Sequence, residues 1–249
     1  MTDVEKLASI LKSSHGAVFF GGAGMSTESG VPDFRSANGI YNRKLHQEFR
    51  PEEMASHSFL VHHPEAFFEF YREHRIFHNI RPNAGHEALA ELERRGIVRL
   101  VVTQNIDGLH QAAGSQNVCE LHGSIARWPC TVCGTIYPTA YVLQEEQKPI
   151  PYGEACGGLV RPGVVLYGEG LDPDVLEKSV RAIRDADTLI VGGTSLVVYP
   201  AAGLIDYFQG RHLVLINQTK THADASADLV IRSPIGQVLK EAVAALPQR

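Results

Sequence analysis

Apolar residues recur along the chain at two spacings, one typical of helices and the other typical of buried strands. Near the start, Val4, Leu7 and Leu11 share one face of a predicted helix, and the apolar run 17–20 (AVFF) then predicts a short strand. That strand leads directly into the stretch 21–24 (GGAG). The start of the chain therefore predicts a helix, a buried strand and a glycine-rich loop.

The same alternation continues over most of the chain. A helix is predicted over 87–95, with Gly96 as its stop, and a strand over 97–103 that leads into the polar residues 104–107 (QNID). After residue 160 the predicted elements are a strand over 164–167, a helix over 173–186, and strands over 188–191 and 212–216. Strands that alternate with helices predict an α/β fold, with a Rossmann-like parallel sheet and helices on both of its faces.

Two stretches interrupt this alternation. Residues 36–84 begin with a polar loop and continue into aromatic-rich helices, and residues 126–158 hold three cysteines without a helical period. We expect these stretches to form a small second domain, in which a helical module joins a cysteine ribbon. The Rossmann-like domain would then consist of residues 1–35, 85–125 and 159–249.

The composition favours a folded protein that works without nucleic acid or a membrane. Of the 249 residues 44% are hydrophobic and 20% are charged, which supplies a sizeable core and argues against disorder. The 23 Lys and Arg residues face 28 Asp and Glu residues, so the net charge of −5 disfavours a nucleic-acid partner. No apolar run approaches the roughly 20 residues of a membrane span, and the start lacks a secretory signal pattern. We therefore expect a cytoplasmic protein.

Polar residues follow four of the predicted strands. They are the stretches 22–27 (GAGMST), 104–107 (QNID) and 193–195 (GTS), and Asn217. In an open parallel sheet, ligands bind beyond the carboxyl ends of the strands. Glycines let the backbone approach a phosphate, and the amides that open the next helix can hold its negative charge. One such loop alone is equally explained by a tight strand-to-helix turn, but four polar strand ends together predict a binding site.

Two further features carry candidate chemistry. The stretch 30–35 (GVPDFR) sets an acid, an aromatic ring and a cation side by side, a combination that suits a dinucleotide. A surface turn stiffened by Pro32 is the alternative explanation. His122 follows a short apolar run and is a candidate general base, because histidine titrates near neutral pH. Taken alone, one of 12 histidines is more often structural.

Six motifs occur in a fixed order along the chain. They are 22–26 (GAGMS), 30–35 (GVPDFR), 103–110 (TQNIDGLH), 121–123 (LHG), 161–162 (RP) with 167–169 (YGE), and 193–196 (GTSL). In this order they resemble the motifs of sirtuins, a family of NAD-dependent protein lysine deacylases, and the resemblance extends over residues from about 17 to 240. The chain is most similar to the compact bacterial sirtuins, because little of it lies outside the catalytic core.

The resemblance implies a reaction in which NAD is consumed as a co-substrate. The carbonyl oxygen of an acyl-lysine attacks the ribose carbon that carries nicotinamide, nicotinamide leaves, and the acyl group departs on ADP-ribose. By resemblance, His122 is the general base and Asn105 orients the ribose or a water. Asp107 and Ile106 would hold the nicotinamide carboxamide, and Phe34 would shield the ribose from water.

The resemblance also assigns binding residues for both substrates. An acyl-lysine protein or peptide would bind between the two domains as a strand beside residues 164–169 and 197–199, although Val164 and Leu166 are equally explained as core. The residues expected to contact the peptide are Val165, Tyr167, Gly168, Glu169, Val197 and Tyr199. The residues expected to contact NAD are Gly22, Ala23, Gly24, Thr27, Asp33, Phe34, Arg35, Gln104, Asn105, Ile106, Asp107, His122, Gly193, Thr194, Ser195, Asn217 and Ile235.

The cysteines depart from the sirtuin pattern, in which two Cys-x-x-Cys pairs bind a structural zinc. Cys130 and Cys133 form one pair, but the second is reduced to Cys156, with Gly153 where its partner is expected. Structural zinc sites are almost always four-coordinate, so this metal site is incomplete and we expect weak zinc binding or none. Cys119 is expected to be a buried apolar residue rather than a replacement ligand.

A second departure concerns the acyl group. Some bacterial sirtuins that remove succinyl or malonyl groups carry an arginine three residues after a tyrosine. Here Tyr71 is followed at that spacing by His74, and Arg75 comes one residue later. Since a histidine holds a carboxylate less well than the fork of an arginine does, we favour acetyl or other neutral acyl groups. Arg75 is only one helical position away and is long enough to reach the same site.

Three other functions fit parts of the sequence. A Rossmann oxidoreductase would also hold NAD, but the loop is GAG rather than G-x-G-x-x-G, and no acidic residue follows at the end of a second strand. An ADP-ribosyltransferase shares the departure of nicotinamide, and His122 argues for deacylation instead. A non-enzymatic cysteine-ribbon module is the third, and the acidic balance makes nucleic acid a poor partner for it. The sequence does not indicate an oligomeric state.

Overall fold

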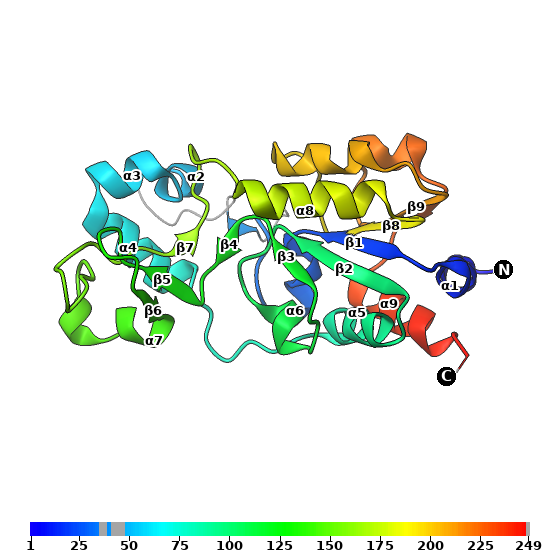
Figure 1. The fold of residues 1–249 in the computed structure, drawn as a ribbon, viewed down its shortest axis with the longest axis horizontal. Helices are drawn as coiled ribbons and strands as arrows, with labels where there is room; N and C mark the ends of the chain where they lie inside the picture. Colours follow the sequence, from blue (N-terminus) through cyan, green and yellow to red (C-terminus); the bar gives the residue numbers. More distant parts are fainter. Residues whose placement is uncertain (35–38, 41–47, 248–249) are drawn as a thin grey trace.

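The computed structural model describes residues 1–34, 39–40 and 48–247, and its largest unit is a six-stranded parallel sheet (Figure 1). The strand order is β10-β9-β8-β1-β2-β3. The strands are β1 (Ala17–Gly21), β2 (Val98–Thr103), β3 (Val118–Glu120), β8 (Thr188–Gly192), β9 (His212–Ile216) and β10 (Leu229–Ile231). β1 lies at the centre, where Phe19 pairs with Val101 of β2 and Ile190 of β8. The predicted parallel sheet is confirmed.

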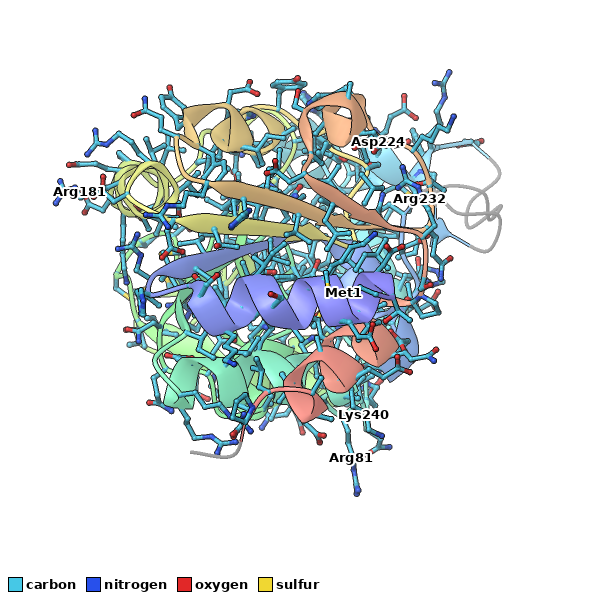
Figure 2. The ribbon with its side chains drawn as sticks, turned by 90° about the vertical axis from the view of Figure 1, so that its right-hand side faces the viewer. Met1, Arg81, Arg181, Asp224, Arg232 and Lys240 are labelled. Carbon is cyan, nitrogen blue, oxygen red and sulfur yellow. The ribbon has the colours of Figure 1, made fainter. Side chains whose placement is uncertain are left out.

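Helices cover both faces of this sheet, as Figure 1 and the turned view of Figure 2 show. One face carries α1 (Asp3–Ser13), α5 (Ala84–Arg94) and α9 (Ile235–Ala244), and the other carries α8 (Pro173–Arg184) and the 3-10 helix η5 (Ala201–Tyr207). Successive residues of β1 point to opposite faces, so Phe19 packs in the first layer while Val18 and Phe20 pack in the second. The predicted α/β architecture is therefore correct.

A smaller unit lies at one end of the sheet, on the left of Figure 1. It contains α2 (Pro51–Met54), α3 (His57–His62), α4 (Pro64–His74), α7 (Thr139–Val142), and the hairpin of β5 (Arg127–Pro129) with β6 (Ile136–Pro138). Trp128 of the hairpin packs edge-on against Tyr71 of α4, and both side chains are almost fully buried. A helical module and a cysteine ribbon thus share one core, as predicted. The limits of the two domains stay a prediction.

The structure corrects the predicted strand over 164–167. Only Gly163–Val164 form a strand (β7), and it pairs antiparallel with β4 (Gly123–Ser124), outside the parallel sheet. Val164 and Leu166 are apolar because both pack in the core of the smaller unit. The pattern of the sequence cannot distinguish such a buried segment from a strand of the main sheet.

Two elements at the end of the chain, β10 and α9, were not predicted. β10 spans three residues, which is too short for an alternating pattern to show. α5 also begins three residues earlier than predicted, because the Asn83 side chain caps it by accepting from Gly85 N and His86 N.

No helix among the described residues is long and apolar enough to cross a bilayer.

Candidate active site

A cavity of about 850 Å³ lies where the loops after β1, β2, β8 and β9 face the smaller unit. Of the residues predicted to contact NAD, its wall contains Gly22, Ala23, Gly24, Thr27, Asp33, Phe34, Gln104, Asn105, Ile106, Asp107, His122, Gly193, Thr194, Ser195, Asn217 and Ile235. Of those predicted to contact the peptide, it contains Val165, Tyr167, Gly168, Glu169 and Tyr199. Val197 is 54% exposed and its neighbour Val198 lines the cavity instead. Arg35 lies outside the described residues.

Two glycine loops touch each other at the cavity wall. The loop after β1 folds into the short helix η1 (Ala23–Met25), and Gly24 N donates to Gly193 O at 2.8 Å. A Cβ on Gly24 would lie 2.8 Å from the Cα of Gly193, and one on Gly193 would collide with Met25 N. Gly193 also has φ +61°, which glycine adopts without strain. This close approach leaves bare backbone at the wall, as a phosphate site requires.

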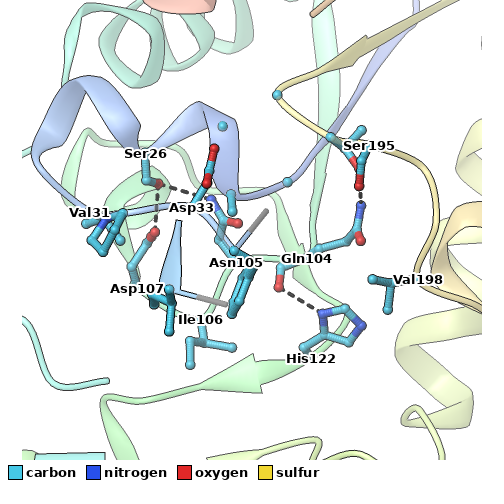
Figure 3. Close-up of a pocket in the computed structure, with 18 of the residues that line it drawn as sticks. Ser26, Val31, Asp33, Gln104, Asn105, Ile106, Asp107, His122, Ser195 and Val198 are labelled. Carbon is cyan, nitrogen blue, oxygen red and sulfur yellow. Dashed lines mark hydrogen bonds between the residues drawn. The ribbon is translucent and has the colours of Figure 1, made fainter. Parts of the chain in front are cut away.

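Three polar side chains form a hydrogen-bonded chain beside these loops (Figure 3). Asn105 Nδ2 donates to Ser26 Oγ at 3.0 Å, and Ser26 Oγ donates to Asp107 Oδ2 at 2.7 Å. Asp107 Oδ1 also accepts from Leu109 N at 3.0 Å, at the start of α6 (Leu109–Ala112). Burial raises the pKa of Asp107, and the hydrogen bonds from Leu109 and Ser26 oppose that rise. Ser26 was not among the predicted site residues, yet it joins the loops after β1 and β2.

His122 lies on the cavity wall between β3 and β4, and a backbone contact sets its tautomer. Its Nδ1 is 2.9 Å from Gln104 O, and since a carbonyl oxygen only accepts, Nδ1 carries the proton of the neutral ring. Burial lowers the pKa of His122, the bond to Gln104 opposes this, and the charge of Arg75 lowers the pKa further. The ring is therefore neutral near pH 7, and its Nε2 has a lone pair that can take up a proton.

The loop after β9 forms another part of the wall and is held by Arg232. Arg232 Nη1 donates to Asn217 O and Thr219 O, both at 2.8 Å. Its Nη2 pairs with Asp224, and Figure 2 shows these two side chains next to each other at the edge of the molecule. Three contacts from one guanidinium thus fix the loop that presents Asn217 to the cavity.

Glu169 lines the cavity but is already bound on several sides. Its carboxylate accepts hydrogen bonds from Arg161 at 2.5 and 3.0 Å and from Leu166 N at 2.9 Å, and it contacts His57 Nδ1 at 2.8 Å. Burial by itself raises the pKa of Glu169, but Arg161 and the other donors lower it to about 2. The structure thus gives Glu169 a positioning role for the segment 164–169.

We expect Glu169→Gln to destabilise the fold in a pH-dependent way. The pKa of Glu169 in the fold is about 2 against the usual 4.5, so its carboxylate stabilises the fold above pH 4.5, and this contribution is lost as the pH falls toward 2. The difference in the free energy of unfolding between wild type and variant should therefore shrink below pH 4.5. Denaturant unfolding at a series of pH values measures it, and a difference that does not change with pH would contradict the assignment.

One end of the cavity is lined by Tyr71 and Arg75, at the end of α4. Tyr71 is 1% exposed, and burial raises its pKa. The guanidinium carbon of Arg75 lies 4.9 Å from the centroid of the Phe34 ring, within the range of a cation–π contact. His74 points elsewhere and contacts Glu73, with 3.5 Å between Nε2 and Oε2. Of the two residues that follow Tyr71 at helical spacing, the structure thus brings Arg75 to the cavity.

Comparison with known proteins agrees with this geometry. A family model described as the Sir2 family matches residues 22–200, a range that includes both glycine loops and His122. This chain belongs to the Sir2 family. The sirtuin is 56% identical over 241 residues to a protein of Clostridium perfringens named NAD-dependent protein deacetylase, with 96% of this chain and 98% of that protein covered. It is 54% identical over 235 residues to a protein of the same name from Cutibacterium acnes, with 94% and 95% covered.

Solved structures share the fold of this sirtuin over nearly its whole length. The crystal structure of a Sir2 homolog–NAD complex matches with a TM-score of 0.86 at 40% identity, covering 96% of this chain and 92% of that chain. A Sir2–p53 peptide–NAD+ complex matches with a TM-score of 0.86 at 35% identity, covering 98% of both chains. The family resemblance that the six motifs indicated is therefore confirmed.

The cysteine ribbon of this sirtuin gathers three thiols. The Sγ atoms of Cys130, Cys133 and Cys156 all lie within 4.8 Å of one another, and that of Cys156 is 3.3 Å from each of the others. The position expected for a fourth ligand holds Gly153, which has no side-chain donor, so these residues do not fit a closed four-coordinate zinc site. Cys119 is 3% exposed and packs in the core against β1 and β2, as predicted.

Proposed function

We propose that this sirtuin is an NAD-dependent protein lysine deacylase that removes acetyl or other neutral acyl groups. The observation that carries the proposal is the placement of a neutral His122, with Nδ1 bound to Gln104, in one cavity with Asn105, Asp107 and two touching glycine loops. The names of the relatives of this sirtuin support NAD and an acyl-lysine protein as substrates. The relatives are named NAD-dependent protein deacetylases, and one solved relative holds a peptide and NAD+.

The cavity offers a separate surface for each part of NAD. Bare backbone at Gly24 and Gly193 suits the pyrophosphate, and the loop at Asn217 suits the adenosine end. Gln104 Nε2 donates to Thr194 Oγ1 at 3.1 Å, which joins the second glycine loop to the end of β2. Asp107, which accepts from Ser26 Oγ and Leu109 N, would hold the nicotinamide carboxamide together with Ile106.

The residues around His122 are arranged for acyl transfer to a ribose. NAD supplies the ribose carbon that the acyl oxygen attacks, and ADP-ribose carries the acyl group away. His122 accepts a proton from a ribose hydroxyl at Nε2, while its Nδ1 stays bound to Gln104. Asn105, fixed by Ser26 and by a 3.0 Å bond from its backbone N to Thr103 Oγ1, orients the ribose or a water. Phe34, under the guanidinium of Arg75, shields the reacting face from water.

An acyl-lysine protein would bind along the segment 164–169. Val165 N donates to His122 O at 2.9 Å, and Tyr167 N donates to Ala55 O at 3.1 Å, so this wall is tied both to the general base and to the smaller unit. Pairing with the peptide main chain would accept many sequences, because the backbone is the same in each. We infer a cytoplasmic reaction without nucleic-acid or membrane partners, since the net charge is −5 and the four cysteines are free thiols.

Product analysis tests the proposal most directly. Protein, NAD and an acetyl-lysine peptide are incubated, and we expect nicotinamide, the free lysine peptide and acetyl-ADP-ribose. Formation of NADH would indicate an oxidoreductase, and protein labelled with ADP-ribose would indicate a transferase. The same peptide with succinyl-lysine should react more slowly, because Arg75 is already engaged with Phe34 and Tyr71. A faster succinyl reaction would contradict the preference for neutral acyl groups.

We expect Asp107→Asn to weaken NAD use and nicotinamide inhibition together. The side-chain oxygen can still accept from Leu109 N, but the new amide nitrogen then faces Ser26, whose hydroxyl proton loses its acceptor. The measurement is the KM for NAD and the inhibition constant of nicotinamide. Ser26→Ala is the matched control, since it breaks the same chain and keeps the carboxylate. If nicotinamide inhibition is unchanged in Asp107→Asn, the residue has only a structural role at the start of α6.

A further inference from the structure

Two neighbouring strands of the sheet end side by side at the part of the cavity proposed for adenosine. Ile216, the last residue of β9, pairs with Ile231, the last residue of β10. Asn217 N then donates to Ile231 O at 3.0 Å, so the hydrogen bonding between the strands continues one bond beyond β9. Asn217 and Arg232, which directly follow the two strands, are therefore held next to each other.

The side chain of Asn217 has a defined orientation. Its Nδ2 donates to Thr219 O at 3.0 Å and lies 3.4 Å from Thr219 Oγ1. Because a carbonyl oxygen only accepts, the amide nitrogen faces Thr219 and Oδ1 points away from it. Within the part of the chain that the structure describes, no residue donates to Oδ1, and Asn217 lines the cavity. An acceptor oxygen is thus available to a ligand there.

Arg232 holds the carbonyl group on which this orientation depends. Thr219 O accepts from Arg232 Nη1 at 2.8 Å as well as from Asn217 Nδ2, so both of its lone pairs are used. The same Nη1 donates to Asn217 O at 2.8 Å. Thr219 is exposed, and among the described residues only Arg232 and Asn217 donate to its carbonyl oxygen. Loss of Arg232 would therefore free the loop that fixes the amide of Asn217.

The positive charge of Arg232 is balanced within the protein. Its Nη2 pairs with Asp224 Oδ2, and Asp224 Oδ1 accepts from Thr221 N at 3.1 Å and from Thr221 Oγ1 at 2.9 Å. Arg232 does not line the cavity, although the next residue, Ser233, does. We therefore expect Arg232 to act on a ligand through Asn217 and not by direct contact.

Building on the proposed function, we propose that Arg232 is a positioning residue for the co-substrate. Through Thr219 O it orients Asn217 so that Oδ1 accepts a hydrogen bond from a hydroxyl of the adenosine ribose of NAD. A ribose hydroxyl can donate to Oδ1, whereas an ionised phosphate ester in its place has only acceptor oxygens. The arrangement should therefore favour a dinucleotide with a free adenosine ribose over one that carries a 2′-phosphate.

The experiment compares the wild type with Arg232→Ala and Arg232→Lys. Calorimetric titration with ADP-ribose measures binding without turnover, and we expect Arg232→Ala to bind about 3–10-fold more weakly, the scale of one lost hydrogen bond. Arg232→Lys keeps a charge for Asp224 but replaces the planar fork with one ammonium group, so it should restore only part of the affinity. Full restoration by lysine would mean that charge alone matters, which contradicts the proposal.

A second ligand separates positioning from a general loss of structure. ADP-ribose with a 2′-phosphate should bind the wild type at least about 10-fold more weakly than ADP-ribose does, because two acceptors would then face each other. This ratio should shrink in Arg232→Ala, since the amide of Asn217 is then free to turn its Nδ2 toward the ligand. A variant that is merely less stable would weaken the binding of both ligands by the same factor.

Steady-state kinetics give a further readout that a structural role would not produce. Arg232→Ala should raise the KM for NAD, while kcat for deacetylation and the inhibition constant of nicotinamide stay near the wild-type values. Arg181→Ala is the matched control, since Arg181 pairs with Glu177 on α8 and lies at the opposite edge of the molecule from Arg232 (Figure 2). Its KM for NAD should be unchanged.

Three results would overturn the proposal and leave the proposed function intact. The first is a folded Arg232→Ala variant with wild-type affinity for ADP-ribose. The second is equal weakening of both ligands in that variant. The third is an active wild type that binds the two ligands equally well. A wild type that binds no ADP-ribose would contradict the proposed function itself. Circular dichroism reports folding, and if Arg232→Ala does not fold, Arg232→Lys and the wild-type ligand preference decide.

Discussion

Replacing His122 with alanine is expected to lower the deacylation rate about 10²–10⁴-fold, the range that general bases contribute. The change removes the Nε2 lone pair and the 2.9 Å bond from Nδ1 to Gln104 O. It keeps the backbone carbonyl that accepts from Val165 N, so the wall beside the peptide should stay in place. Initial rates with saturating NAD and an acetyl-lysine peptide measure the loss, and calorimetry should show that much of the NAD binding remains.

The pH dependence supplies an independent check of the same role. Because burial and Arg75 lower the pKa of His122 below its usual 6.5, the base is deprotonated near neutral pH. The wild-type rate should therefore fall as the pH drops through that lowered pKa. The residual rate of His122→Ala should not show this decrease. His15→Ala is a suitable control, since His15 is exposed and lies before β1, away from the cavity. Near-normal turnover in His122→Ala would contradict the assignment of His122 as the general base.

Four of the six strands of the sheet, β1, β2, β8 and β9, could be predicted from the sequence because they are short, largely apolar runs that lead into polar residues. Phe19 and Ile190 are buried between two helical layers, so their strands, β1 and β8, appear as uninterrupted apolar runs rather than as alternating ones. Since parallel strands end at one edge, the polar residues that follow them had to meet, and the cavity contains them. The apolar pattern gave a wrong prediction for residues 164–167. Their burial in the core of the smaller unit produces the same apolar pattern as a strand of the main sheet.

Other parts of the site depend on contacts that no local pattern encodes. Ser26 donates to a carboxylate 81 positions away in the sequence, and only the pairing of β1 with β2 brings the two together. Ile235 lines the cavity because α9 begins beside the loop after β1, where Gly236 N donates to Glu28 Oε2 at 2.6 Å. Arg75 reaches the cavity from the end of α4 and meets Phe34 there. A helical period can suggest which residues lie on the same face of a helix. It does not indicate which residues of other elements that face contacts, because the tertiary fold determines those contacts.

Gly193→Ala is expected to reduce kcat/KM for NAD about 10²-fold, the loss that a misplacement of 1 Å can cause in a reacting geometry. A methyl group at this position would collide with Met25 N and crowd the backbone of Gly24. The two glycine loops would have to separate, and the 2.8 Å bond from Gly24 N to Gly193 O would be lost. Since both glycines line the cavity, the surface proposed for the pyrophosphate would change shape.

The control for this variant must share its backbone strain but not its collision. Gly96→Ala does so, because Gly96 has φ +70° against +61° for Gly193, and a Cβ there meets nothing within 4 Å. Both variants should lose about 1–3 kcal/mol of stability from the left-handed conformation. Gly96 precedes β2, at the end of the strand opposite the cavity, so its variant should keep the wild-type KM for NAD. Equal losses of NAD use in the two variants would mean that backbone strain, and not the contact between the loops, determines how NAD binds.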